Sequence, residues 1–87
     1  MATTKLNEPV SVSFAFDSTK ASVEPRALIW KGRLHAIRKV GLHHKFKQGK
    51  ILFHVFSVAS NSSFFRLVLN TENLHWRLEA ISDNLPN

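Results

Sequence analysis

The feature of this sequence that most constrains its fold is a series of short segments in which large apolar residues recur at, or close to, every second position. The segments over 10–16, 51–59, 64–69 and 74–81 show it most clearly. On a β-strand, successive side chains point to opposite faces, so a period of two gathers the apolar residues on one face. Polar turn sequences separate the segments at intervals of about ten residues. The pattern predicts an all-β fold, either a small antiparallel meander or an SH3-like or OB-like barrel of five or six strands.

The length of 87 residues allows one domain. Residues 1–9 are polar and end in a proline, which favours a disordered leader. We expect a single β-domain over 10–83 and a frayed tail over 84–87. The chain has no cysteine, no apolar run of membrane-spanning length and no signal-peptide pattern at its start. These absences favour a cytoplasmic protein without disulfides and without a membrane partner.

The middle of the chain is less regular. Residues 25–30 form an apolar segment, and Lys31-Gly32 is typical of a tight turn or a bulge. The pattern over 34–40 is weaker, as it would be if a bulge interrupted the strand. Residues 41–49 contain several basic residues between two glycines and are predicted to be a loop. A helix around 74–80 is the main alternative to a strand there, because the apolar spacing also fits a helical period.

Charge is distributed very unevenly. The net charge is +6, and no acidic residue lies between Pro25 and Thr71, a stretch that contains nine of the lysine and arginine residues. Such a field attracts phosphate backbones and other polyanions. The opposing interpretation is that the positive charge serves only solubility. We expect the partner to be nucleic acid, and the charge pattern does not distinguish DNA from RNA.

Catalytic patterns are missing. The six carboxylates lie near the two ends of the sequence, and no nucleophile elbow, phosphate-binding glycine loop or zinc motif occurs. We therefore expect a protein that is not an enzyme and has no cofactor. His35, His54 and His75 lie on three predicted strands and would bind a metal only if they converged, while ordinary sheet positions are the more common role of such histidines.

Two phenylalanines stand apart from the predicted core. Phe46 lies between two lysines, and Phe64 faces away from Phe65, on the same side as Arg66. An exposed aromatic ring among cations can stack on a nucleic-acid base, although either ring could instead anchor a loop or a second apolar layer. Phe64 and Arg66 are the predicted base contacts. The predicted phosphate contacts are Lys31, Arg33, Arg38, Lys39, Lys45, Lys47 and Lys50.

Two short motifs carry a family resemblance. The run from Pro25 to His35, which contains Trp30-Lys31-Gly32-Arg33, and the later run from Leu74 to Glu79 resemble a family of short bacterial β-domains with a Trp-x-Gly-Arg element. Similar segments occur beside or fused to some Y-family polymerase-like proteins. The resemblance covers roughly 25–83 and implies a small β-domain in a DNA-related context. It assigns no binding residues.

The alternative function is protein interaction or self-association. The segment Val10–Phe16 carries four large apolar side chains on one strand face. Such a strand either pairs within the sheet or adds to the edge of a partner's sheet, as in a homodimer.

Overall fold

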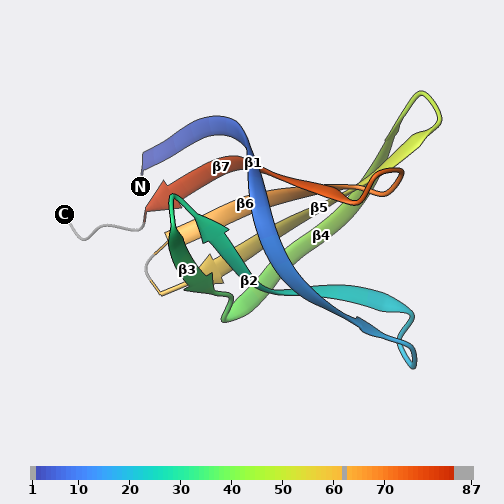
Figure 1. Cartoon of the computed structure of the whole chain (residues 1–87), viewed down its shortest axis with the longest axis horizontal. Helices are drawn as coiled ribbons and strands as arrows, with labels where there is room; N and C mark the ends of the chain where they lie inside the picture. Colours follow the sequence, from blue (N-terminus) through green and yellow to red (C-terminus); the bar gives the residue numbers. More distant parts are fainter. Residues whose placement is uncertain (1, 62, 84–87) are drawn as a thin grey trace.

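The computed structural model describes residues 2–61 and 63–83, which form an antiparallel all-β domain without a helix in those ranges (Figure 1). Its seven strands are β1 (Ala2–Asp17), β2 (Ser22–Trp30), β3 (Arg33–Ala36), β4 (Lys39–Gln48), β5 (Ile51–Ser60), β6 (Ser63–Asn70) and β7 (His75–Asp83). Neighbouring strands follow the order β3-β2-β1-β7-β6-β5-β4. The chain therefore makes two meanders, which the pairing of β1 with β7 joins.

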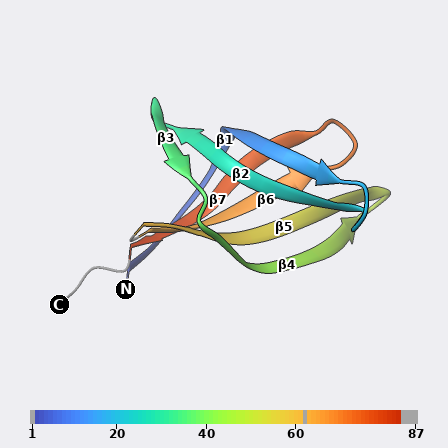
Figure 2. The same ribbon diagram turned by 90° about the horizontal axis from the view of Figure 1, so that it is seen from below.

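β1 is long and bent, and its two halves belong to different sheets. Ala2 to Val10 pairs with β7, whereas Ser11 to Asp17 pairs with β2. When the halves are counted separately, the fold has eight strands in two open sheets, one of five strands and one of three. Figure 2 shows the three-stranded sheet lying over the five-stranded sheet as a second layer.

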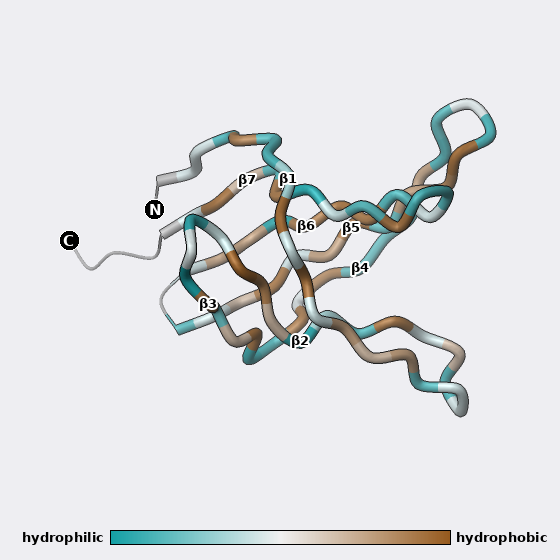
Figure 3. The backbone as a smooth tube through the Cα atoms, viewed as in Figure 1, coloured by the Kyte–Doolittle hydropathy of each residue, from teal (hydrophilic) through white to brown (hydrophobic). Residues whose placement is uncertain are grey.

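The core fills the space between the two layers. It is built from Leu28 on β2 and from one face of β5, β6 and β7, which we call the inner face. Its fully or nearly fully buried members are Leu28, Phe56, Val58, Phe65, Leu67, Leu69, Trp76 and Leu78. The tube in Figure 3 shows this hydrophobic band along the central strands, with hydrophilic residues at most turns. The predicted alternation over 64–69 and 74–81 is thus confirmed as a core pattern.

The prediction of five or six strands is wrong, because two segments were not recognised as strands. The first is the predicted basic loop at 41–49, of which residues 41–48 belong to β4. Every residue of β4 is exposed, since it lies at the edge of the five-stranded sheet. An exposed edge strand needs no continuous apolar face, and in β4 the alternating apolar residues Leu42 and Phe46 stand among lysines and histidines, which favoured the interpretation as a basic loop.

The second unrecognised strand segment is the polar leader. Residues 2–9, predicted to be disordered, form the first half of β1 and pair with β7, and Leu6 packs against the core. Backbone pairing supplies hydrogen bonds that do not depend on apolar side chains. The polar composition of residues 2–9 therefore did not reveal that they form a strand. The predicted frayed tail at 84–87 lies outside the described residues.

The remaining fold predictions have mixed outcomes. The all-β antiparallel class is confirmed, but the two sheets formed by the described residues are open, so the barrel is not closed. The tight turn at Lys31-Gly32 is confirmed, and both residues have the positive φ that a type I′ hairpin turn requires. Trp76 is buried, whereas Trp30 is only partly buried. No helix long and apolar enough to span a membrane occurs among the described residues.

Candidate nucleic-acid interface

One face of the five-stranded sheet points away from the core, and we call it the outer face. Among the described residues, neither the three-stranded sheet nor a helix covers it (Figure 2). Directly paired residues of antiparallel strands project to the same side, so the register identifies its side chains. Four rows cross it from β4 to β7: Lys39, Ala59, Phe64 and Ser82; Leu42, Ser57, Arg66 and Ala80; His44, Val55, Val68 and Arg77; Phe46, Phe53, Asn70 and His75.

Apolar and aromatic side chains dominate the middle of the outer face. Val55 and Val68 pair with each other and are buried, although the main core lies on the opposite side of the sheet. Phe64 is 40% exposed and Phe46 is 41% exposed. The Phe46 ring stacks on Phe53 with centroids 5.0 Å apart and planes 11° from parallel. The outer face therefore presents flat rings on an apolar floor.

Arginine side chains stand on the same face. The Arg66 Nε donates to Glu79 across 3.1 Å, and both side chains are about half exposed. The Arg77 Nε donates to the Asn7 side-chain oxygen at 2.7 Å, and the same guanidinium also donates to the Asn7 backbone carbonyl. These bonds restrain the two guanidinium groups beside the apolar floor. Each group also keeps nitrogens outside the bonds named here, which can donate to an anion.

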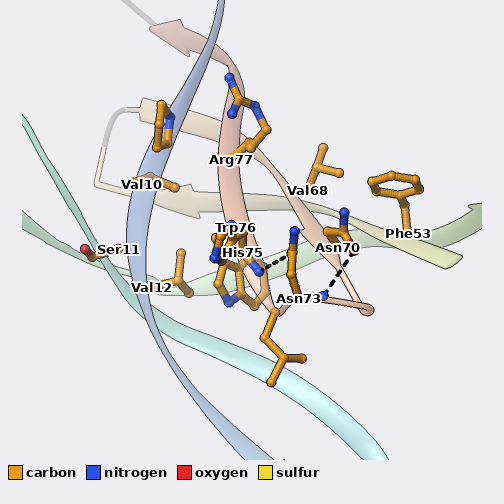
Figure 4. A pocket seen from close by; sticks show the side chains of 12 residues that line it. Val10, Ser11, Val12, Phe53, Val68, Asn70, Asn73, His75, Trp76 and Arg77 are labelled. Atoms are coloured by element: carbon orange, nitrogen blue, oxygen red, sulfur yellow. Dashed lines mark hydrogen bonds between the residues drawn. The ribbon is translucent and has the colours of Figure 1, made fainter. Parts of the chain in front are cut away.

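Two hollows mark the ends of the outer face. The larger has a volume of about 770 Å³ and lies where β1 parts from β7, between the strand segment Pro9–Val12 and the side chains of Phe53, Val68 and Arg77 (Figure 4). The smaller, of about 290 Å³, is bordered by Leu42, Ala59 and Phe64 near the other end. A chain lying across this face would thus find an apolar recess at each end.

The β6–β7 turn is shaped by two asparagine side chains at the rim of the larger hollow. The Asn70 side-chain oxygen accepts from the backbone N–H groups of Glu72 at 2.9 Å and Asn73 at 3.4 Å. The Asn73 side-chain oxygen accepts from the His75 N–H at 2.9 Å (Figure 4). These local bonds are the Asx turns that asparagine favours, and they fix the position of the rim.

The hairpin of β4 and β5 carries a second set of cations. Lys45 and Lys47 are exposed and project to the side opposite Phe46, while Lys50 lies in the turn at the tip. On the same side, the His43 Nε2 and the His54 Nδ1 lie 2.7 Å apart, within hydrogen-bond distance. Burial lowers the pKa of both imidazoles, and the positive charge of Lys45 lowers it further. At least one of the two rings must therefore be neutral at this contact.

The predicted site residues do not form one patch. Lys39, Phe64 and Arg66 share the outer face, and Lys45, Lys47 and Lys50 lie on the adjoining hairpin of β4 and β5. Lys31 and Arg33 are at the β2–β3 turn, in the layer that covers the opposite side of the five-stranded sheet (Figure 2) and at the end of the molecule away from the tip of the β4–β5 hairpin (Figure 1). Lys31 stands 4.8 Å from the centre of the Trp30 ring. Arg38 lies between β3 and β4, where its Nε donates to Asn61.

Sequence reasoning missed Arg77 and the Phe46–Phe53 stack as parts of the outer face. Arg77 lies outside the acid-free stretch, so the charge argument did not reach it. The signal that would have found it is parity, because Arg77 alternates with Trp76 and Leu78 and so must project away from the core. Phe46 was assigned to a loop, where the position along the chain does not indicate to which face a side chain projects.

The three histidines considered for a metal site do not converge. His35 contacts Trp30 and Phe65 between the layers, His54 pairs with His43, and His75 lies on the outer face. In the described ranges, no group of three or more histidine, aspartate or glutamate side chains is placed to hold a metal ion.

Comparison with known proteins identifies no relative: no family model, curated protein or solved structure matches this chain. The geometry and chemistry of the surface itself are therefore the basis for a proposed function. The resemblance to bacterial β-domains with a Trp-x-Gly-Arg element remains a prediction.

Proposed function

We propose that this chain is a non-catalytic nucleic-acid-binding domain that holds a single strand across its outer face. The observation that carries the proposal is Phe64, an exposed aromatic ring beside Arg66 and Lys39 on an uncovered sheet face. Small β-domains of the OB-fold class bind single strands through a sheet face, with rings that stack on bases and cations that contact phosphates.

A single strand suits this face better than a duplex. A base can stack on Phe64 or Phe46 only when its own flat side is free, and the bases of a duplex are already stacked on one another. The two hollows at the ends of the face would accept unstacked bases. Arg66, Arg77 and Lys39 surround the apolar floor, so the phosphates of an extended strand would lie near positive charge.

The hairpin of β4 and β5 extends the positive field beyond the sheet. Lys45, Lys47 and Lys50 are exposed, and no residue of β4 is acidic. Lys45 and Lys47 project from the edge strand to the side opposite Phe46, so we assign these lysines to attraction and to backbone contact around this edge rather than to base recognition. Lys31 and Arg33 belong to the three-stranded sheet, which lies over the other side of the five-stranded sheet (Figure 2), and are left out of the proposed interface.

The test is a fluorescence-anisotropy titration with labelled single-stranded DNA, single-stranded RNA and duplex DNA, each at about 50 mM and about 200 mM salt. We expect single strands to bind more tightly than duplex. If about four phosphates are neutralised, log K should fall with log salt at a slope of about −3. Failure of every nucleic acid to bind at better than about millimolar affinity in low salt would refute the proposal.

Phe64→Ala separates stacking from simple charge attraction. Removal of a base-stacking ring is expected to cost about 1–3 kcal/mol of binding to single strands and little for duplex. Leu34→Ala is the control, since it removes an exposed apolar side chain from β3, outside the proposed interface. Equal losses in both variants, or none in either, would mean that Phe64 does not contact a base.

A further inference from the structure

The two open sheets leave four strand edges unpaired within the described residues, and three of them carry features that resist pairing with another chain. β4 has Lys39, Lys45 and Lys47 along its length. β3 has only four residues and begins with Arg33. The first half of β1 includes Lys5, Glu8 and Pro9. Charges, proline and short length are the usual means by which natural edge strands avoid association.

The fourth edge lacks this protection. From Ser11 to Phe16, β1 pairs with β2 on one side, and its other side is unpaired in the described structure. This segment contains no charged residue and no proline. Phe14 is 43% exposed and Phe16 is 63% exposed. The hairpin of β1 and β2 projects from the body of the molecule, so its outer part is accessible (Figure 1).

We propose that this edge of β1 pairs with the same edge of a second copy of the chain, in an antiparallel homodimer. A two-fold axis at Phe14 would place Val12 opposite Phe16 of the other copy and Ser13 opposite Ala15, with the two Phe14 side chains facing each other. All apolar residues then fall on one face of the joined sheet and all small residues on the other. The segment is therefore complementary to itself.

The distribution of charge also favours pairing at this edge of β1 over pairing at the lysine-rich edge of β4. Each copy carries a net charge of +6, so two copies repel each other wherever their lysines meet. Pairing of two β4 edges would bring six strand lysines together, whereas pairing of two β1 edges over Ser11 to Phe16 brings none. The proposed dimer leaves Phe64, the smaller hollow and the hairpin of β4 and β5 outside the paired segment, whereas Ser11 and Val12 also border the larger hollow. The pairing itself requires no nucleic acid.

The test is light scattering coupled to size-exclusion chromatography, over a concentration range of about 1 μM to 1 mM. We expect a concentration-dependent dimer. Phe16→Lys should weaken it about tenfold or more, because the two-fold symmetry makes every change act twice. Leu42→Lys is the matched control, since it adds the same charge at an equally exposed apolar residue on the β4 edge and should not change the dimer.

A charge pair tests the register. Ser13→Lys and Ala15→Glu should each weaken self-association, and a mixture of the two variants should form a heterodimer, because the proposed pairing sets these positions opposite each other. A chain that is monomeric over the whole range overturns the proposal. It is also overturned if Leu42→Lys disrupts the dimer while Phe16→Lys does not. Circular dichroism of each variant establishes that a lost dimer is not a lost fold.

Discussion

The two hairpins that project from the body share a geometry and differ in chemistry. The hairpin of β1 and β2 is uncharged along the free edge of β1 and exposes Phe14 and Phe16. The hairpin of β4 and β5 has lysines along its free edge and is exposed over the whole of β4. Figure 1 shows both extending toward the same end of the molecule and spreading apart. We propose that these similar backbones serve different partners, a second copy in one case and a polyanion in the other.

Both hairpins depend on one side chain at their base. The Trp76 ring lies 5.8 Å from Phe14 on β1 and 5.6 Å from Phe56 on β5, measured between ring centres. Trp76 is 6% exposed, and its indole N–H has no hydrogen-bond partner among the described residues. The hairpins therefore differ at their solvent-exposed edges, where both charged and apolar side chains are tolerated, and they share a contact with Trp76 in the packed core.

Trp76→Ala is expected to have the largest effect, because it removes the contact that both hairpins share. The cavity and the lost apolar burial should cost about 3–5 kcal/mol, enough to unfold much of a domain of this size. A urea titration followed by circular dichroism measures the loss. Leu74→Ala is the control, since Leu74 is exposed two positions away. A Trp76→Ala protein as stable as the parent would contradict the assignment of Trp76 to the core.

Reversal of charge on one hairpin and then the other is expected to separate their functions. The double variant Lys45→Glu and Lys47→Glu should weaken nucleic-acid binding and make the salt slope less steep by about two, or about one for each lost phosphate contact. Lys20→Glu, in the turn between β1 and β2, should change the slope little. Anisotropy titrations at several salt concentrations give the slopes. If Lys20→Glu has the larger effect, the assignment of the two hairpins is reversed.

Phe16→Ala and Phe56→Ala compare how much a phenylalanine ring on each hairpin contributes to stability. Phe16 is highly exposed near the end of β1, so the monomer should lose about 0.5 kcal/mol or less. Phe56→Ala, at a buried position on the other hairpin, should cost about 3–5 kcal/mol. Urea midpoints at low protein concentration measure both. A large loss for Phe16→Ala would place its ring in the core instead of on a free edge.

The smallest effect we expect is a pH dependence confined to the hairpin of β4 and β5. Burial first, and then nearby positive charge, lower the pKa values of His43 and His54 below the ordinary value near 6.5. The unfolded chain therefore binds more protons than the folded chain once the pH falls below about 6.5. The stabilising contribution is complete above that pH and is lost as the pH falls toward the folded pKa values.

Urea midpoints at about pH 7.5 and about pH 5.5 test this dependence. His54→Gln should reduce the difference between the two midpoints, because glutamine can still form a hydrogen bond but does not titrate. His75→Gln is the control, since His75 lies on the outer face away from the histidine pair. An unchanged difference in the His54→Gln protein would show that the pair does not set the pH response.

Part of the candidate site was predictable and part was not. Parity alone placed Phe64 opposite Phe65 and beside Arg66, and the register confirms both relations. The acid-free stretch correctly marked the lysines of β4 as lacking acidic neighbours in sequence. The acid-free stretch gave no information on the direction in which each side chain projects. It therefore grouped Lys31 and Arg33 with the lysines of the β4–β5 hairpin, whose tip lies at the other end of the molecule (Figure 1).

The sequence by itself determined the strand class, most of the core and the lack of acidic residues in the central stretch. These properties follow from a period of two and from composition, which are local. Only the tertiary structure decided that residues 2–9 join the sheet, that β4 is an edge and that β1 divides between two sheets. The physical reason is that strand pairing joins residues far apart in the chain through backbone groups that every residue shares. The free edge of β1 is thus a property of the fold, although the absence of charge along it is a property of the sequence.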